Sequence, residues 1–144
     1  MTKTDRFTIP VGIFIMIRQE DKILLQLRQN CSFSGYYGFV GGHLDGQESI
    51  VSAAIREVHE EIGISINPND LILKTICHSN QGKEYLQFYF ECSKWSGNIE
   101  NKEPEKCAKL EWHNWDNLPV NCCPYIYEAV NKIKNSIAFY EDKF

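Results

Sequence analysis

The segment from residue 42 to residue 64 constrains this chain more than any other, because its spacing fixes a turn and a helix together. It reads G-H-L-D-G-Q-E-S-I-V-S-A-A-I-R-E-V-H-E-E-I-G-I. From Glu48 to Ile62 it has good helix formers and no glycine or proline. Gly63 follows, where a left-handed C-cap is common. Four apolar residues recur along one stripe, which predicts an amphipathic helix: Ile50, Ala53, Ala54 and Val58.

Three carboxylates are neighbours on one face of this predicted helix. Glu57 precedes Glu60 and Glu61 by three and four residues, and side chains at those separations are neighbours. Carboxylates held this close repel one another, so an isolated cluster is destabilising or partly protonated. A divalent cation would remove the conflict, and hard oxygen ligands suit Mg²⁺ or Mn²⁺, which also coordinate phosphates. Arg56, beside Glu57, has a planar fork of donors that can hold a carboxylate.

A bare E-x-x-E-E pattern has a simpler interpretation, a solvated acidic helix face with Arg56 in a surface ion pair. The wider spacing argues against it. The pattern is fixed at seven positions: Gly42, Glu48, Arg56, Glu57, Glu60, Glu61 and Gly63. At a background frequency of roughly one in fifteen each, the joint match by accident is on the order of one in 10⁸ positions. Val58 and Ile64 supply apolar residues at two further places. The acidic face is therefore interpreted as functional.

The rest of the chain predicts one α/β domain over residues 1–144. Residues 30–46 hold five glycines and are expected to form a loop, and residues 94–106 form a polar loop. A second amphipathic helix is expected at residues 124–137. Strands are expected at residues 7–17, 23–28, 71–78, 85–92 and 110–113. This order predicts a mixed β-sheet with helices on both faces.

Composition excludes several partners. The net charge is −4, which argues against a binder of nucleic-acid polymers, because such a protein carries a basic face. It does not exclude a phosphate substrate, since a divalent metal ion can supply positive charge locally. No apolar run approaches the length of a membrane span, and residues 1–6 carry no apolar signal segment. We therefore expect a cytoplasmic protein, with its six cysteines reduced.

The segment 42–64 resembles the signature of the Nudix hydrolase family at every specified position, and the predicted element order fits that fold. The resemblance implies an α/β/α sandwich and metal-dependent attack of water on a nucleoside diphosphate linked to another group. The cofactor implied is Mg²⁺, which Mn²⁺ can replace. The implied metal ligands are Glu57, Glu60, Glu61 and the carbonyl of Gly42. Glu48 and Arg56 are implied to orient these carboxylates.

Within this family, the chain is most similar to MutT-like nucleoside triphosphate pyrophosphohydrolases. Glu103 matches a loop glutamate of those enzymes that serves the metal site, although a plain surface loop is an equal alternative. The general base is either Glu57 or Glu103. Asn121 matches an asparagine that contacts the base, and its alternative is a turn or helix-cap role. Tyr37 and Phe39 are candidates for stacking on a base, or else they pack in the core.

The resemblance leaves three functions open. The leading one is hydrolysis of a (d)NTP to a nucleoside monophosphate and pyrophosphate, a reaction of a small nucleotide substrate. The second is hydrolysis of ADP-ribose or another nucleotide sugar. The third is a nucleotide-binding Nudix module without catalysis, although such modules usually lose carboxylates that are all present here. The sequence does not decide between a monomer and a homodimer.

Overall fold

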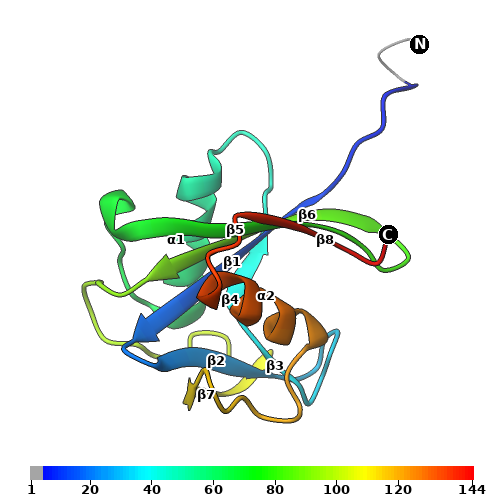
Figure 1. Ribbon diagram of the computed structural model, residues 1–144. Coiled ribbons are helices and arrows are strands. Elements are labelled where there is room, and N and C mark those ends of the chain that lie inside the picture. The colour runs from blue at the N-terminus through cyan, green and yellow to red at the C-terminus, as the bar shows by residue number, and fades with distance from the viewer. Residues whose placement is uncertain (1–4) are drawn as a thin grey trace.

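Strand β1 (Val11–Gln19) forms the centre of the fold in the computed structural model, which describes residues 5–144 (Figure 1). On one side it pairs in parallel with β6 (Glu84–Cys92), and on the other it pairs antiparallel with β4 (Val40–His43). Its last two residues continue into an antiparallel hairpin with β2 (Lys22–Arg28). One strand therefore joins two parts of the sheet.

The remaining strands extend the sheet in both directions. β5 (Leu71–Asn80) lies antiparallel to β6, and β8 (Phe139–Asp142) lies parallel to β5 at the edge. β2 also pairs antiparallel with β3 (Tyr37–Gly38) and β7 (Cys107–Asn114). The sheet thus contains parallel and antiparallel pairs, and the predicted mixed sheet is confirmed.

Two helices, α1 (Ile50–Ile62) and α2 (Pro124–Lys134), pack into separate cores on opposite faces of β1 (Figure 1). Successive side chains of a strand point to opposite faces. The core of α1 accordingly receives Ile13, Ile15 and Ile17. The core of α2 receives Met16, with Phe14 packed against it. This arrangement confirms the predicted α/β sandwich. Among the described residues, neither helix is long and apolar enough to cross a membrane.

The ends of α1 follow from local chemistry. The side chain of Ser49 accepts a hydrogen bond from the backbone N–H of Ser52, so the helix begins at Ile50, two residues later than predicted. At the other end Gly63 has a φ of 78°, and its N–H donates to the carbonyl of His59. The predicted left-handed cap is therefore confirmed. Glu48 lies just before the helix, in the turn that leads into it.

The loop predicted at residues 30–46 was partly wrong, because β3 and β4 lie within it. Glycine usually weakens a strand, so the glycine-rich sequence masked both. Here the glycines serve close packing. A Cβ atom on Gly41 would lie 2.2 Å from the carbonyl oxygen of Ile13 on the paired strand. β4 can therefore pair with β1 only if position 41 has no side chain.

Other boundaries also differ from prediction. The first strand begins at Val11 instead of residue 7, and β7 is longer than the predicted strand at 110–113. The second helix ends at Lys134, three residues before the predicted end. β8 was not predicted, because it has only four residues and forms by pairing with β5. The 3-10 helix η2 (Pro68–Asp70) lies directly before β5.

Candidate active site

A cleft of about 790 Å³ lies beside α1 and brings together loops and strands that are distant in sequence. Acidic side chains gather in its lining: Asp45, Glu57, Glu60, Glu61 and Glu103. The lining also has an aromatic part: Phe14, Phe33, Phe39, Tyr85 and Tyr125. Basic groups line it too: Arg28, Arg56, Lys83 and Lys106. The cleft thus offers acceptors for a cation, flat apolar surface and positive charge in one space.

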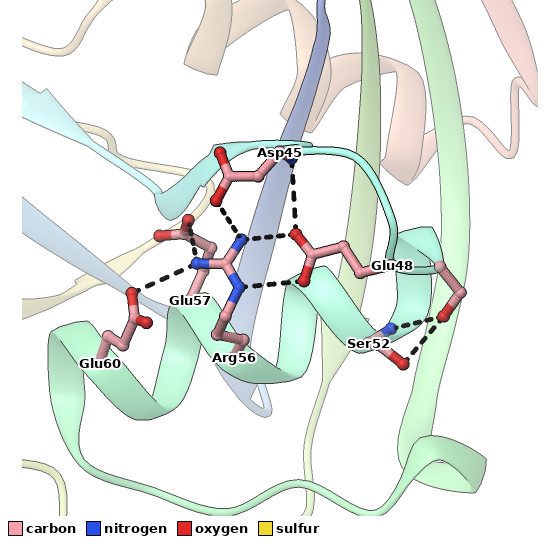
Figure 2. Close-up of polar contacts among 7 residues, drawn as sticks. Asp45, Glu48, Ser52, Arg56, Glu57 and Glu60 are labelled. Atoms are coloured by element: carbon pink, nitrogen blue, oxygen red, sulfur yellow. Dashed lines mark hydrogen bonds and ion pairs between the residues drawn. The ribbon is translucent and has the colours of Figure 1, made fainter.

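Arg56 connects the carboxylates at the start of α1 with those in its middle (Figure 2). Its Nε and Nη2 atoms donate to the two carboxylate oxygens of Glu48 at 3.0 and 2.7 Å. Its Nη1 atom donates to Glu57 at 3.0 Å and to Glu60 at 3.3 Å. Nη2 also lies 3.3 Å from Asp45. One guanidinium therefore fixes the relative positions of four carboxylates.

The pair of Arg56 and Glu48 keeps opposite charges at neutral pH. Hydrogen bonding to Arg56 lowers the pKa of Glu48 below its ordinary value. The same contact, with a smaller one to Glu57, raises the pKa of Arg56. A two-point contact of this kind also fixes the plane of the guanidinium. The two side chains have the contact that the predicted orienting role requires, and the role itself stays a prediction.

Gly42 allows Glu57 to lie against the backbone of β4. A Cβ atom at position 42 would be 2.5 Å from both Cδ and Oε1 of Glu57, so a side chain there would displace the carboxylate. The glycine therefore lets Glu57 keep its position against the strand. This packing places Glu57 at the strand whose Gly42 carbonyl is the predicted additional metal ligand.

Glu61 points into the protein, and Gln26 of β2 holds it there. The Gln26 amide nitrogen donates to Oε1 of Glu61 at 3.2 Å, while Oε2 is buried without a hydrogen-bond partner among residues 5–144. Burial, followed by the nearby Glu57 carboxyl, raises the pKa of Glu61 to about 9. A buried oxygen with no donor and a neighbouring negative charge is the environment that a bound cation would relieve.

Glu60 departs from the predicted ligand cluster. Its side chain is 52% exposed and turned toward Arg56. Across residues 5–144, no three acidic, histidine or cysteine side chains stand close enough to hold a metal ion. Glu60 is directed outward to Arg56, whereas Glu61 lies on the buried side of the helix. Glu57 and Glu61 supply the carboxylate oxygens that a divalent ion prefers, and Glu60 would join them by leaving Arg56, which it contacts at 3.3 Å.

The structure brings Glu103 to the same cleft as the α1 carboxylates, although 42 residues separate it from Glu61. Its backbone N–H donates to the side chain of Asn101, and its carbonyl accepts from Lys106 and Cys107. Its negative charge also contributes to the raised pKa of Glu61. The predicted loop glutamate is therefore held in a turn at the site.

The candidate substrate-binding residues lie in different places. Phe39 borders the cleft but is only 1% exposed and packs in the core of α2, which was the alternative to base stacking. Tyr37 is buried, donates from its hydroxyl to Glu111, and is not part of the lining. Asn121 is outside the lining as well, and its amide donates to the carbonyl of Gly35 at 3.0 Å. Tyr37 instead links β3 to β7, and Asn121 links two turns, so the structure does not bring either side chain to the cleft as expected.

Sequence reasoning missed several cleft residues. Asp45 lies at an unspecified position of the 42–64 segment, where nothing marks it. Phe14 alternates with core isoleucines on β1, and Tyr125 is in the first turn of α2. Their rings are 4.9 Å apart, and both belong to the aromatic part of the cleft lining. Gln26 had one available signal, since it is the polar residue inside the apolar run I-L-L-Q-L.

The fold and this site define an α/β domain with an acidic helix beside a cleft. Residues 6–130 match the family model described as the NUDIX domain. The chain therefore belongs to the NUDIX family, as its 42–64 segment indicated.

Known proteins similar to this chain differ in what they act on. One is mRNA decapping complex subunit 2 of Schizosaccharomyces pombe, 36% identical over 77% of this chain and 15% of that protein. Another is 8-oxo-dGTP diphosphatase of Proteus vulgaris, 30% identical over 72% of this chain and 90% of that protein. The MutT NUDIX hydrolase structure from Burkholderia pseudomallei superimposes with a TM-score of 0.79 at 25% identity, covering 87% of this chain and 98% of that one.

The lengths of these relatives differ greatly. The chain spans 15% of the decapping subunit and about a third of several other curated relatives. The match therefore covers a small part of those proteins, whereas it covers 90% of the 8-oxo-dGTP diphosphatase.

Proposed function

We propose that this domain is a Mg²⁺-dependent pyrophosphohydrolase that splits a nucleoside triphosphate into a nucleoside monophosphate and pyrophosphate. The observation that carries the proposal is the meeting of Glu57, Glu61 and Glu103 in one cleft with an aromatic surface. A nucleotide needs both kinds of surface, because its phosphates require cations and its base requires a flat apolar contact.

The metal ion would be held by carboxylates from α1 and by the Gly42 carbonyl. Glu57 and Oε2 of Glu61 are available for this, and Glu60 becomes available when it leaves Arg56. When bound, Mg²⁺ neutralises the diphosphate and lowers the pKa of the attacking water. Arg56 and Glu48 keep Glu57 in place through their mutual hydrogen bonds. Either Glu57 or Glu103 accepts the proton of the water.

The aromatic lining of the cleft suits the nucleoside. Phe14 and Tyr125 offer partly exposed ring surface for a base, and Arg28 adds positive charge near it. Base–aromatic stacking contributes about 1–3 kcal/mol per base and tolerates different bases. The similarity to an 8-oxo-dGTP diphosphatase over 90% of that protein favours a nucleoside triphosphate over longer substrates.

Two other activities remain alternatives that the same assay separates. ADP-ribose and nucleotide sugars contain the same diphosphate, so the carboxylates do not discriminate against them. A nucleotide-binding module without catalysis would bind nucleotide and release no product. Capped RNA belongs in the assay as well, because one relative is named as a decapping subunit.

The test is product release from a substrate panel, with and without Mg²⁺. Purified protein is incubated with the common and oxidised (d)NTPs, ADP-ribose, a UDP-sugar and a capped RNA. Chromatography resolves monophosphate, diphosphate and sugar-phosphate products. We expect Mg²⁺-dependent formation of a nucleoside monophosphate and pyrophosphate, and loss of turnover in Glu61→Gln. Turnover without Mg²⁺, or at the wild-type rate in Glu61→Gln, would overturn the proposal.

A further inference from the structure

We propose that Gln26 is a positioning residue for metal binding, which holds Glu61 so that its Oε2 atom faces the site. The inference rests on the proposed function, because it assigns Glu61 to a divalent metal ion. Gln26 lies on β2, outside the 42–64 segment, and does not itself serve as a ligand in this proposal.

Gln26 is buried in the middle of a strand whose other central residues are apolar. It is paired with Gly38 of β3 and Leu110 of β7, so its backbone position is fixed from both sides. Its side chain is 9% exposed and lines the cleft beside Glu61. An amide in such a place costs free energy unless it is hydrogen-bonded. The buried Gln26 amide therefore requires hydrogen-bond partners inside the protein.

The partners of Gln26 determine which way its amide faces. The side-chain nitrogen donates to the Phe39 carbonyl at 3.0 Å and to Oε1 of Glu61 at 3.2 Å. Both partners are acceptors, so only the NH₂ group, with its two hydrogens, satisfies them together. The bond to Phe39 anchors the amide to the residue before β4. The second hydrogen is then aimed at Glu61.

The consequence is an asymmetric carboxylate. Oε1 of Glu61 is occupied by Gln26, whereas Oε2 is buried and has no donor in the part of the chain that the structure describes. A hydrogen bond to one oxygen limits rotation of the carboxyl group and leaves the other oxygen for a cation. Residues that support a metal ligand in this way typically contribute 10–100-fold to metal affinity.

The experiment measures Mn²⁺ binding directly, by electron paramagnetic resonance of the free ion in titrations without nucleotide. The test variants are Gln26→Met and Gln26→Leu, two apolar replacements of different shape that lack the donor. The matched control is Arg18→Met, which removes the 2.9 Å hydrogen bond from another buried carboxylate, Glu91, away from the cleft. Circular dichroism and thermal unfolding in EDTA establish that each variant is folded.

We expect the Kd for Mn²⁺ to rise about tenfold or more in both Gln26 variants and to stay within about twofold in Arg18→Met. Wild-type affinity in a folded Gln26 variant would overturn this inference and leave the proposed function standing. If the wild-type protein binds no Mn²⁺, the proposed function fails and this inference fails with it.

A double-variant comparison separates positioning from a general structural role. If Gln26 acts through Glu61, then adding Gln26→Met to Glu61→Gln changes the Mn²⁺ Kd by less than about threefold, because the carboxylate it positions is already gone. A full tenfold loss in the Glu61→Gln background would show that Gln26 affects the site by another route, such as the Phe39 carbonyl, and would contradict the proposal.

Discussion

Two neighbouring carboxylates of α1, Glu60 and Glu61, are held in opposite ways. Glu60 is half exposed and belongs to the charged network around Arg56. Glu61 is 8% exposed and is held by a neutral amide from a different strand. The network partners Glu48, Arg56, Glu57 and Glu60 come from one stretch of sequence, whereas Gln26 and Glu61 meet only through the fold.

The difference concerns what each arrangement can do for a cation. Arg56 already neutralises part of the negative charge on the carboxylates that it contacts. The Arg56 network therefore fixes the positions of those carboxylates, but it competes with a metal ion for Glu60. The Gln26 contact adds no positive charge, and burial together with the Glu57 carboxyl raises the pKa of Glu61 to about 9. A bound metal ion would therefore stabilise Glu61 more than Glu60. The Arg56 network fixes the positions of the other carboxylates.

The largest effect is expected at Glu57, which contacts both arrangements. Glu57→Gln should lower turnover by about 10³-fold and weaken Mn²⁺ binding, because a metal ion contributes several kcal/mol and each 1.36 kcal/mol is tenfold in rate. Steady-state kinetics and Mn²⁺ titration measure the two quantities. Glu103→Gln tests which residue is the general base. A similar loss of turnover with unchanged Mn²⁺ affinity would identify Glu103 as the base, whereas a loss below about tenfold would identify Glu57.

A smaller effect is expected from Arg56→Lys, which tests whether the outward network organises the site. Lysine keeps the charge but lacks the fork that binds both oxygens of Glu48. The Kd for Mn²⁺ should rise roughly 10–100-fold while the protein stays folded. Arg18→Lys is the control, because Arg18 contacts Glu91 through a single nitrogen. Unchanged Mn²⁺ affinity in Arg56→Lys would mean that a positive charge at position 56 is enough to organise the site, and that the two-point contact with Glu48 is not needed.

The smallest effect is expected at the aromatic end of the cleft. Tyr125→Leu should raise KM about tenfold with kcat within about threefold, since stacking of a base contributes about 1–3 kcal/mol. Asn121→Ala serves as its comparison and should leave KM within about twofold, because that side chain is bonded to Gly35 outside the cleft. An equal rise of KM in Asn121→Ala, with wild-type thermal stability, would restore Asn121 as a base-contacting residue.

Much of the local structure was predictable from sequence, because its causes are local. The apolar stripe and Gly63 predicted α1 and its left-handed end, and the three-and-four spacing predicted that Glu57 neighbours Glu60 and Glu61. β3, β4 and β8 were not predicted, because they are short and form only by pairing with other strands. A strand that depends on a distant partner leaves a weak pattern in its own residues.

The sequence by itself determined the family, the acidic helix and the residue types that suit a divalent ion. Only the tertiary structure decided which partners each carboxylate meets. Glu60 and Glu61 are adjacent and chemically identical, but helical spacing places only Glu61 in line with Ala54 and Val58 on the buried stripe. Packing supplies the partners: the buried Glu61 meets Gln26, and Glu60 contacts Arg56 at the surface. The same packing removed Tyr37 and Asn121 from the cleft and placed Phe14 and Tyr125 in it, because contacts between distant segments are set by the fold.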